Sequence, residues 1–219
     1  QGMVDFFKDS LRDQVDDQQA LAVGVALQKD LLLLTGGPGT GKTRTIVTML
    51  AAHLQANPGM LVALAAPTGK AAFRMRESVL ETMGLLDLPD SIRSALLDSA
   101  RSTTLHRLLG SRIGSVEFRR NKGNPLPHDL VVVDEASMVD LPLMAKLCDA
   151  LRDKAKLILV GDADQLAPVQ GGAVFNGLVK PSKRNVFSPG DLPMTTDFSS
   201  SGTESEGDDP LAGTLVCLS

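Results

Sequence analysis

Residues 36–43, Gly-Gly-Pro-Gly-Thr-Gly-Lys-Thr, have the spacing G-x-x-x-x-G-K-S/T of a phosphate-binding P-loop. Glycines let successive backbone N–H groups approach phosphate oxygens without a Cβ in the way. Lys42 would reach the β- and γ-phosphates of a nucleotide, and the Thr43 hydroxyl would bind Mg²⁺. The N-terminus of a following helix would add partial positive charge. The predicted nucleotide-binding residues in this stretch are Gly36, Gly37, Pro38, Gly39, Thr40, Gly41, Lys42, Thr43 and Arg44.

A second chemical signal is the pair Asp134 and Glu135, which ends the apolar run 130–133. Carboxylates delivered at the carboxyl end of a parallel strand lie where such sheets bind ligands. Asp134 would hold Mg²⁺ through its hydration shell, and Glu135 would act as the general base that orients the attacking water. Two acids at a strand end are common by themselves, but these follow the P-loop by about 90 residues. Together the two signals predict a nucleotide-hydrolysing site.

Two glutamines are candidates for the same site. Gln165 follows the apolar run 157–160, where an amide could bond both a γ-phosphate oxygen and a water. Gln19 lies upstream of the P-loop, and its amide could pair with an adenine edge. From spacing alone, however, an exposed glutamine on a helix is the favoured interpretation of Gln19.

Two further stretches suggest contact with anions. Residues 67–70, Pro-Thr-Gly-Lys, form a strand-to-helix turn that suits an anion, although an ordinary loop explains them equally well. Residues 101–122 carry six Arg or Lys side chains against one acid. A loop exposed to solvent is the usual explanation of such a charge run. The more specific explanation is a surface that binds the phosphates of a nucleic-acid backbone.

The elements that must position these residues alternate along the chain. Strands are predicted near 31–35, 61–66, 130–134 and 157–161, with helices between them. This order predicts an α/β fold in which a parallel sheet is covered by helices on both faces. Residues 1–15 are expected to end a preceding helical segment, and residues 16–179 to form the nucleotide-binding domain. Residues 180–219 are acidic and rich in Ser and Thr, without apolar periodicity until the last ten, and are expected to be disordered.

Composition narrows the class of protein. The 219 residues carry a net charge of −4 and 43% hydrophobic residues, which is normal for a globular core. The two cysteines, Cys148 and Cys217, suggest neither a disulfide framework nor a zinc site, so a reducing cytoplasm is the expected location. No apolar run is long enough to span a membrane, and no signal peptide is visible. Because the chain begins with Gln1, we expect it to be part of something longer.

The motifs, taken in order, resemble those of superfamily-one DNA helicases, and specifically the RecD family, the alpha subunits of exodeoxyribonuclease V. The resemblance covers roughly residues 15–179. Motif I alone would indicate only a P-loop NTPase, whereas the next three segments together are specific to RecD-like proteins. The segments that carry the resemblance are 36–43 (GGPGTGKT), 66–72 (APTGKAA), 104–110 (TLHRLLG), 132–138 (VVDEASM) and 161–166 (GDADQL).

The resemblance implies the first RecA-like motor domain of a helicase, which binds ATP and Mg²⁺ and contacts single-stranded DNA. It implies RecB- and RecC-like subunits as partners and 5′-to-3′ polarity. Under it Gln19 becomes a candidate adenine contact, and Gln165 the residue that couples the γ-phosphate to DNA movement. The implied DNA-facing residues are Thr68, Lys70, Thr104 and His106.

One departure from the family pattern affects the expected activity. Nothing after Val179 resembles the second motor domain, which supplies an arginine worth about 10³–10⁵ in rate in related NTPases. We therefore expect nucleotide binding with weak hydrolysis, and no translocation by this chain alone. The tail is explained equally by an artefact, a truncated reading frame or a natural terminus.

Three functional hypotheses remain open at this point. The first is the motor domain itself. The second is a nucleotide-gated binding subunit without motor activity of its own. The third, and weakest, is a P-loop ATPase that is not a helicase.

Overall fold

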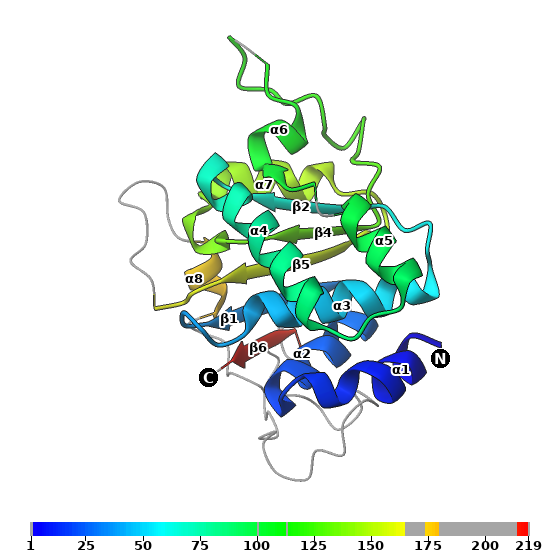
Figure 1. Ribbon diagram of the computed structural model, residues 1–219. Helices are drawn as coiled ribbons and strands as arrows, with labels where there is room; N and C mark the ends of the chain where they lie inside the picture. The colour runs from blue at the N-terminus through cyan, green and yellow to red at the C-terminus, as the bar shows by residue number, and fades with distance from the viewer. Residues whose placement is uncertain (1, 100, 113, 165–173, 180–213, 219) are drawn as a thin grey trace.

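The computed structural model describes residues 2–99, 101–112, 114–164, 174–179 and 214–218. Within these residues six strands form one sheet in the order β3-β2-β4-β5-β1-β6, and every neighbouring pair is parallel. Figure 1 shows this sheet with helices packed against it. The strands are β1 (Leu31–Gly36), β2 (Val62–Ala66), β3 (Thr103–Thr104), β4 (Leu130–Val133), β5 (Lys156–Gly161) and β6 (Leu215–Leu218). The α/β fold class predicted from the sequence is confirmed.

Helices fill most of the connections between these strands. Their starts follow local signals: Asp16 caps α2, Thr68 caps α4 and Asp140 caps α7, each through its side-chain oxygen. The α-helices are α1 (Gly2–Phe6), α2 (Asp17–Gln28), α3 (Lys42–Ala56), α4 (Gly69–Leu85), α5 (Asp90–Ser99), α6 (Leu105–Leu109), α7 (Leu141–Ala150) and α8 (Val174–Val179). The π-helical turn η1 (Phe7–Leu11) and the 3₁₀ turns η2 (Arg12–Gln14) and η3 (Ala136–Met138) complete the described elements. No helix in these parts of the chain combines the length and apolar character needed to cross a bilayer.

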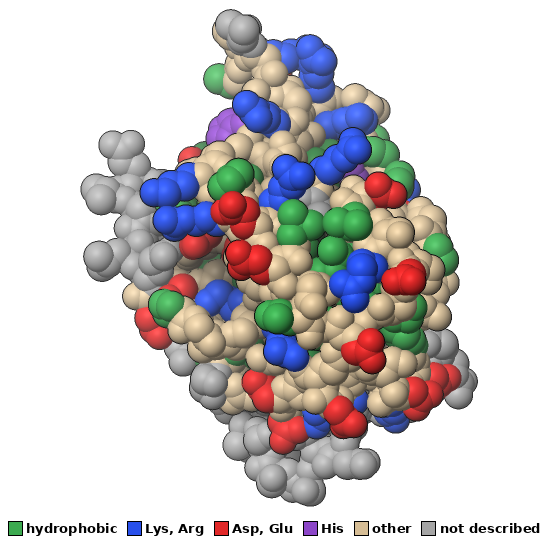
Figure 2. All heavy atoms as spheres, in the orientation of Figure 1, with side chains coloured by type: hydrophobic (Ala, Val, Ile, Leu, Met, Phe, Trp, Pro, Cys, Tyr) green, Lys and Arg blue, Asp and Glu red, His purple; other side chains and the backbone are tan. Residues whose placement is uncertain are grey.

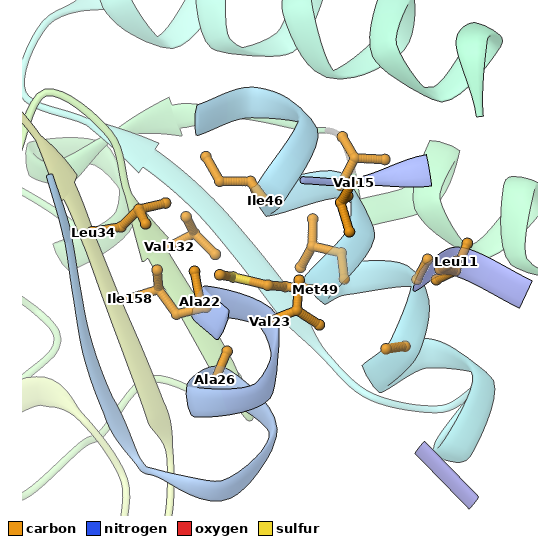
Figure 3. Packing of buried hydrophobic residues seen from close by; sticks show 14 of the residues in the cluster. Leu11, Val15, Ala22, Val23, Ala26, Leu34, Ile46, Met49, Val132 and Ile158 are labelled. Atoms are coloured by element: carbon orange, nitrogen blue, oxygen red, sulfur yellow. The ribbon is translucent and has the colours of Figure 1, made fainter. Parts of the chain in front are cut away.

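The sheet separates two hydrophobic layers, because successive side chains of a strand point to opposite faces. On one face Leu32 and Leu34 of β1 join the apolar sides of α1 to α5. Figure 3 shows Ile46 and Met49 of α3 close to the sheet residues of this layer. On the other face Leu33 belongs to the layer formed with α6, α7 and α8. Burial on both faces explains why the strands read as continuous apolar runs.

The strand order decides where the loops meet. Strand β5 lies between β1, which leads into the P-loop, and β4, which leads into the acidic pair. Because all three strands are parallel, their carboxyl ends lie at the same edge of the sheet. This edge is where a ligand of an open parallel sheet is expected.

The end of the chain corrects one expectation. The segment 180–219 was expected to be disordered, and that does not hold for residues 215–218, which form β6 beside β1. These four residues, Leu-Val-Cys-Leu, are apolar, and pairing gives the outer edge of β1 its hydrogen-bond partners. Residues 180–213 lie outside the described part of the chain.

Candidate nucleotide-binding site

The P-loop connects the end of β1 to the first turn of α3. Gly39 and Gly41 have φ angles of 81° and 80°, in the left-handed region that favours glycine. A hydrogen bond within the loop stabilises its turn: the Thr40 hydroxyl donates to the carbonyl oxygen of Gly37 at 2.9 Å. A Cβ placed on Gly37 or Gly39 would meet no atom within 4 Å, so this side of the loop is open. The glycines therefore leave room for a phosphate group.

Lys42 lies across this loop. Its ammonium donates to the carbonyl oxygens of Gly36 and Gly37, each at 2.7 Å. These bonds use two of the three donors of an ammonium and keep the charge beside the loop backbone. The lysine is half-buried, so its charge is partly screened from solvent. The structure thus holds a cation where the motif requires one.

Asp134 and Glu135 follow β4 at the same edge. The Asp134 carboxylate accepts a bond from the backbone N–H of Glu135 at 2.8 Å. Burial raises the pKa of Asp134, and the nearby Glu135 charge adds to the rise, while the Glu135 N–H and the Lys42 ammonium oppose it. Only β5 separates the strand before the P-loop from the strand before Asp134, so Lys42 and Asp134 lie at the same edge of the sheet. The structure brings the two strongest sequence signals together.

Glu135 has an unusual backbone. Its φ and ψ angles are 53° and 38°, in the left-handed region that few residues with a side chain adopt. Such strain is commonly kept at functional sites. Glu135 lies two residues after the end of β4, and the turn η3 starts at the next residue.

A cavity of about 230 Å³ opens beside the acidic pair. It joins the carboxyl end of β4 to the turn that starts α4, so Asp134 and Glu135 share one cavity with two of the predicted DNA-facing residues, Thr68 and Lys70. The lining residues are Thr68, Lys70, Ala71, Arg74, Asp134, Glu135 and Met138. Sequence reasoning missed Arg74, although it lies one helical turn after Lys70 and therefore on the same face of α4.

The four predicted DNA-facing residues divide into two kinds. Thr68 and Thr104 are helix caps, whose hydroxyls accept from the backbone N–H groups of Ala71 at 3.2 Å and Arg107 at 3.3 Å. Lys70 and His106 are exposed. The His106 ring lies 5.8 Å from the ring of Phe118, tilted by 58°. DNA contact by these residues stays a prediction.

Gln19 is buried, with 6% of its surface exposed, so the interpretation of it as an exposed helical residue is wrong. Spacing along α2 could not reveal this, because the burying group is the P-loop, which is distant in sequence. The Gln19 amide donates to the carbonyl oxygen of Thr40 at 3.5 Å. Arg44, also predicted to bind nucleotide, donates through Nε to the carbonyl oxygen of Gln14 at 2.6 Å. Nucleotide contact by either residue stays a prediction.

Gln165 lies outside the described residues. The segment leading toward it is attached to the site, because the backbone N–H of Ala163 donates to the Thr35 hydroxyl at 3.1 Å. Thr35 is the penultimate residue of β1, next to the first glycine of the P-loop. The end of β5 is therefore tied to the strand that carries the loop.

The residues present fit a magnesium–nucleotide complex. In the described parts of the chain no group of three or more His, Cys, Asp or Glu side chains could enclose a metal. Mg²⁺ does not need one, because it usually keeps several waters and binds one or two protein groups plus phosphates. The hydroxyl of Thr43 and the carboxyl of Asp134, both half-buried, supply such groups.

Comparison with known proteins agrees with this geometry. The RecBCD enzyme subunit RecD of Mycobacterium tuberculosis (strain CDC 1551 / Oshkosh) is 51% identical over 168 residues, which cover 74% of this chain and 28% of that protein. The subunit of the same name from Haemophilus influenzae is 41% identical over 172 residues, covering 77% of this chain and 27% of that protein. The ATP-dependent RecD2 DNA helicase of Deinococcus radiodurans is 40% identical over 161 residues, covering 74% of this chain and 19% of that protein.

The chain therefore spans less than a third of the length of these curated relatives. Separately, a family model described as an AAA domain matches residues 19–171, a range that includes the P-loop and the acidic pair. This match takes in most of the chain, and the protein therefore belongs to the AAA domain family, with a RecD-like nucleotide-binding region.

Proposed function

We propose that this chain is the first motor domain of a RecD-like DNA helicase, in which ATP hydrolysis is coupled to movement along single-stranded DNA. The observation that carries the proposal is the meeting of the P-loop with the acidic pair at one sheet edge. Only β5 lies between the strand that leads to Lys42 and the strand that leads to Asp134, and Asp134 in turn lines a cavity with Lys70. One edge thus joins the residues for nucleotide chemistry to those expected to face DNA.

Each residue has a separate proposed role. Lys42 binds the β- and γ-phosphates, and Thr43 and Asp134 hold Mg²⁺, which neutralises phosphate charge when it is bound. Glu135 accepts the proton of the attacking water, a role that its place beside the open cavity permits. Gln165 is proposed to sense the γ-phosphate.

The proposed DNA surface starts at Lys70 and continues toward α6. Figure 2 shows Lys and Arg side chains gathered on the upper part of this face, near α4 and α6, and Asp and Glu more numerous along its lower rim. Of the six basic residues in 101–122, all but the half-buried Arg120 are exposed. Such a basic region suits the phosphates of a nucleic-acid strand. By similarity to the relatives, RecB- and RecC-like subunits are the proposed partners, and the bacterial cytoplasm the proposed location.

Nucleotide binding tests the site itself. We expect the Lys42→Ala variant to bind Mg²⁺-ATP about 10- to 100-fold more weakly than the wild type, because a hydrogen-bonded charge is lost. Calorimetric titration measures this. Lys8→Ala, which changes an exposed lysine on η1, is the matched control. Equal affinity of wild type and Lys42→Ala would refute the site.

DNA dependence tests the motor. We expect slow ATP turnover that single-stranded DNA stimulates, and loss of much of that stimulation in Lys70→Ala. A response to DNA that is flat in the wild type would instead indicate a nucleotide-gated binding subunit. No DNA binding even at low salt, where phosphate contacts are strongest, would favour an ATPase that is not a helicase.

A further inference from the structure

Helix α4 carries a phenylalanine that the hydrophobic core does not use. The buried side of this helix is formed by residues at helical spacing, Ala72, Met75, Val79 and Met83. Phe73 lies outside this stripe, and 59% of its surface is exposed. The other four phenylalanines in the described parts of the chain are buried or half-buried. Packing of the fold therefore does not account for the ring of Phe73.

The surroundings of Phe73 are basic. Lys70 precedes it by three residues, and Arg74 and Arg76 follow it by one and three; all three cations are exposed. Residues three apart on a helix are neighbours on its surface, so Lys70 lies beside the ring. The acid Glu77 comes one turn farther along α4. An anion beside the ring is therefore attracted toward the first turns of α4.

The start of α4 adjoins the basic segment 101–122. Strands β2 and β3 are parallel, with Ala66 opposite Thr104, so α4 and α6 begin at neighbouring points of one sheet edge. The Ser102 hydroxyl donates to the carbonyl oxygen of Ala72, directly before Phe73. The exposed ring therefore lies where the cations of α4 meet those of the segment 101–122.

Proteins that bind single-stranded nucleic acids combine cations, which attract the phosphates, with aromatic rings on which bases stack. Helix α4 offers both within about one turn, in a chain without Trp or Tyr. We propose that Phe73 is a base-stacking residue: a base of single-stranded DNA lies on its ring, and the adjoining phosphates bind Lys70 and Arg74. This inference rests on the proposed function, since it adds a contact with the bases to the same DNA surface.

Salt dependence separates stacking from phosphate contact. Each phosphate contact on a single strand contributes about 0.7 to the slope of log affinity against log salt, whereas stacking contributes nothing to it. Phe73→Ala should therefore weaken oligothymidylate binding about 5- to 100-fold and keep the slope. Lys70→Ala should reduce the slope by about 0.7. Leu85→Ala, which changes a 76% exposed side chain at the other end of α4, is the matched control and should bind as the wild type does.

A strand without bases gives a second comparison. An abasic oligonucleotide of the same length keeps the phosphates but has nothing to stack on a ring. We expect the wild type and Phe73→Ala to bind it equally, and Lys70→Ala to bind it more weakly. Because Phe73 is exposed, Phe73→Ala should melt at the wild-type temperature, which separates lost stacking from lost fold.

The absence of Trp and Tyr from the sequence permits a direct spectroscopic test. Phe73→Trp keeps an aromatic face and makes the fluorescence of the chain that of a single indole. Oligothymidylate should bind this variant at least as tightly as the wild type and quench its emission, because a base stacked on an indole quenches it. The abasic strand should leave the emission unchanged. In Leu85→Trp, neither strand should quench.

The outcomes separate this inference from the proposed function. Equal oligothymidylate binding by the wild type and Phe73→Ala would overturn the stacking role. An equal loss of affinity for the abasic strand would also overturn it, because the ring would then contact the DNA backbone. In both cases a weakening in Lys70→Ala would leave the DNA surface itself in place. If the wild type bound neither oligonucleotide at low salt, the proposed function would fail, irrespective of Phe73.

Discussion

Charged side chains at the two ends of the parallel sheet have different surroundings. At the amino end, Lys156 donates to the carbonyl oxygens of Ala26 at 3.2 Å and Lys29 at 2.7 Å, and lies 3.6 Å from Asp30. Its neighbour in space, Asp129, pairs with Arg152 and accepts from the backbone N–H of Leu61 at 2.8 Å. Here each charged side chain has partners within the protein, although burial lowers the pKa of Lys156 against the opposing effect of Asp30.

At the carboxyl end two carboxylates lie next to one another in sequence. Asp134 is half-buried beside the carboxylate of Glu135, and burial raises its pKa although a backbone N–H and Lys42 oppose the rise. Glu135 adds backbone strain at the same place. Burial therefore shifts the pKa of a charged group at each end. What distinguishes the carboxyl end is that two adjacent carboxylates and a residue with strained backbone line a cavity there.

The largest expected effect comes from removing the proposed general base at the carboxyl end, Glu135. Glu135→Gln should lower single-turnover ATP hydrolysis about 10²–10⁴-fold, because the amide cannot accept the proton of water, while Mg²⁺-ATP still binds. Glu117→Gln, which changes a surface acid paired with Lys146, is the control. Hydrolysis at the wild-type rate would assign the base role to another group.

The next effect concerns the amino end. His53, near the end of α3, is buried, and burial together with the Lys156 charge lowers its pKa to about 4. In the unfolded chain it takes up a proton near pH 6.5, so folding stability should fall as pH decreases from about 6.5 to 4, by up to about 3 kcal/mol. Urea unfolding across this range should show a flatter profile for His53→Gln. The exposed His106→Gln should keep the wild-type profile, and a wild-type slope in His53→Gln would contradict the assignment.

A smaller expected effect concerns thermal stability and the carboxyl group of Asp134. Burial raises the pKa of Asp134 above 3.8, so the folded carboxyl keeps its proton to higher pH than the unfolded one. Folding stability is then lost as pH rises through that window and stays lower at neutral pH. Asp134→Asn should therefore raise the Tm at pH 7, by about 2–4 °C for each kcal/mol regained. Asp98→Asn, at an exposed position, should not change it, and a lowered Tm in Asp134→Asn would mean that the carboxylate stabilises the fold.

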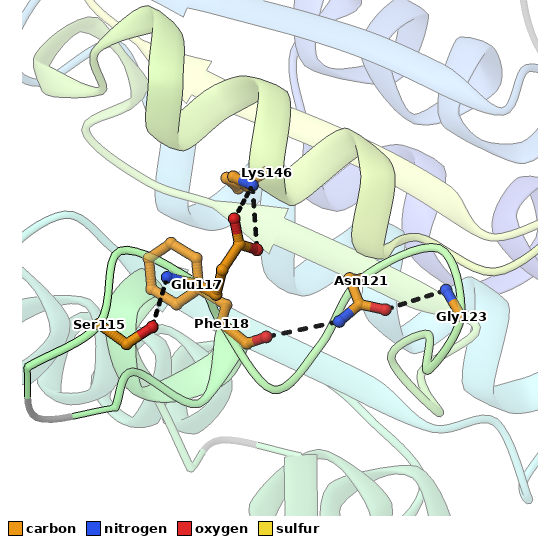
Figure 4. A network of polar contacts seen from close by, with 6 residues as sticks. All are labelled: Ser115, Glu117, Phe118, Asn121, Gly123 and Lys146. Atoms are coloured by element: carbon orange, nitrogen blue, oxygen red, sulfur yellow. Dashed lines mark hydrogen bonds and ion pairs between the residues drawn. The ribbon is translucent and has the colours of Figure 1, made fainter.

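The smallest effect lies away from both ends. Figure 4 shows Lys146 of α7 paired with Glu117, and the bond is 3.3 Å long between two well-exposed side chains. Lys146→Ala should change the free energy of unfolding by no more than about 0.5 kcal/mol, because solvent screens such pairs. Chemical denaturation measures this, and a larger loss would show that this surface contact contributes more to stability than the general rule allows.

Sequence reasoning succeeded where the signal is continuous along the chain. Four leucines before the P-loop and four apolar residues before Asp134 predict the buried strands β1 and β4 within a residue or so of their observed ends. Strand β3 has only two residues, which is too short for a periodic signal. Strand β6 lies in a segment of unlike composition, and its place depends on the free edge of β1.

The candidate site divides in the same way. The residue types and spacing of 36–43 and of Asp134-Glu135 were enough to predict the chemistry, because a phosphate-binding turn and a strand-end carboxylate pair are made by consecutive residues. Only the tertiary structure decided that β5 separates their two strands, that Arg74 joins the cavity, and that Gln19 is buried against Gly41. These features arise from contacts between residues distant in sequence, and such contacts exist only once the chain has packed.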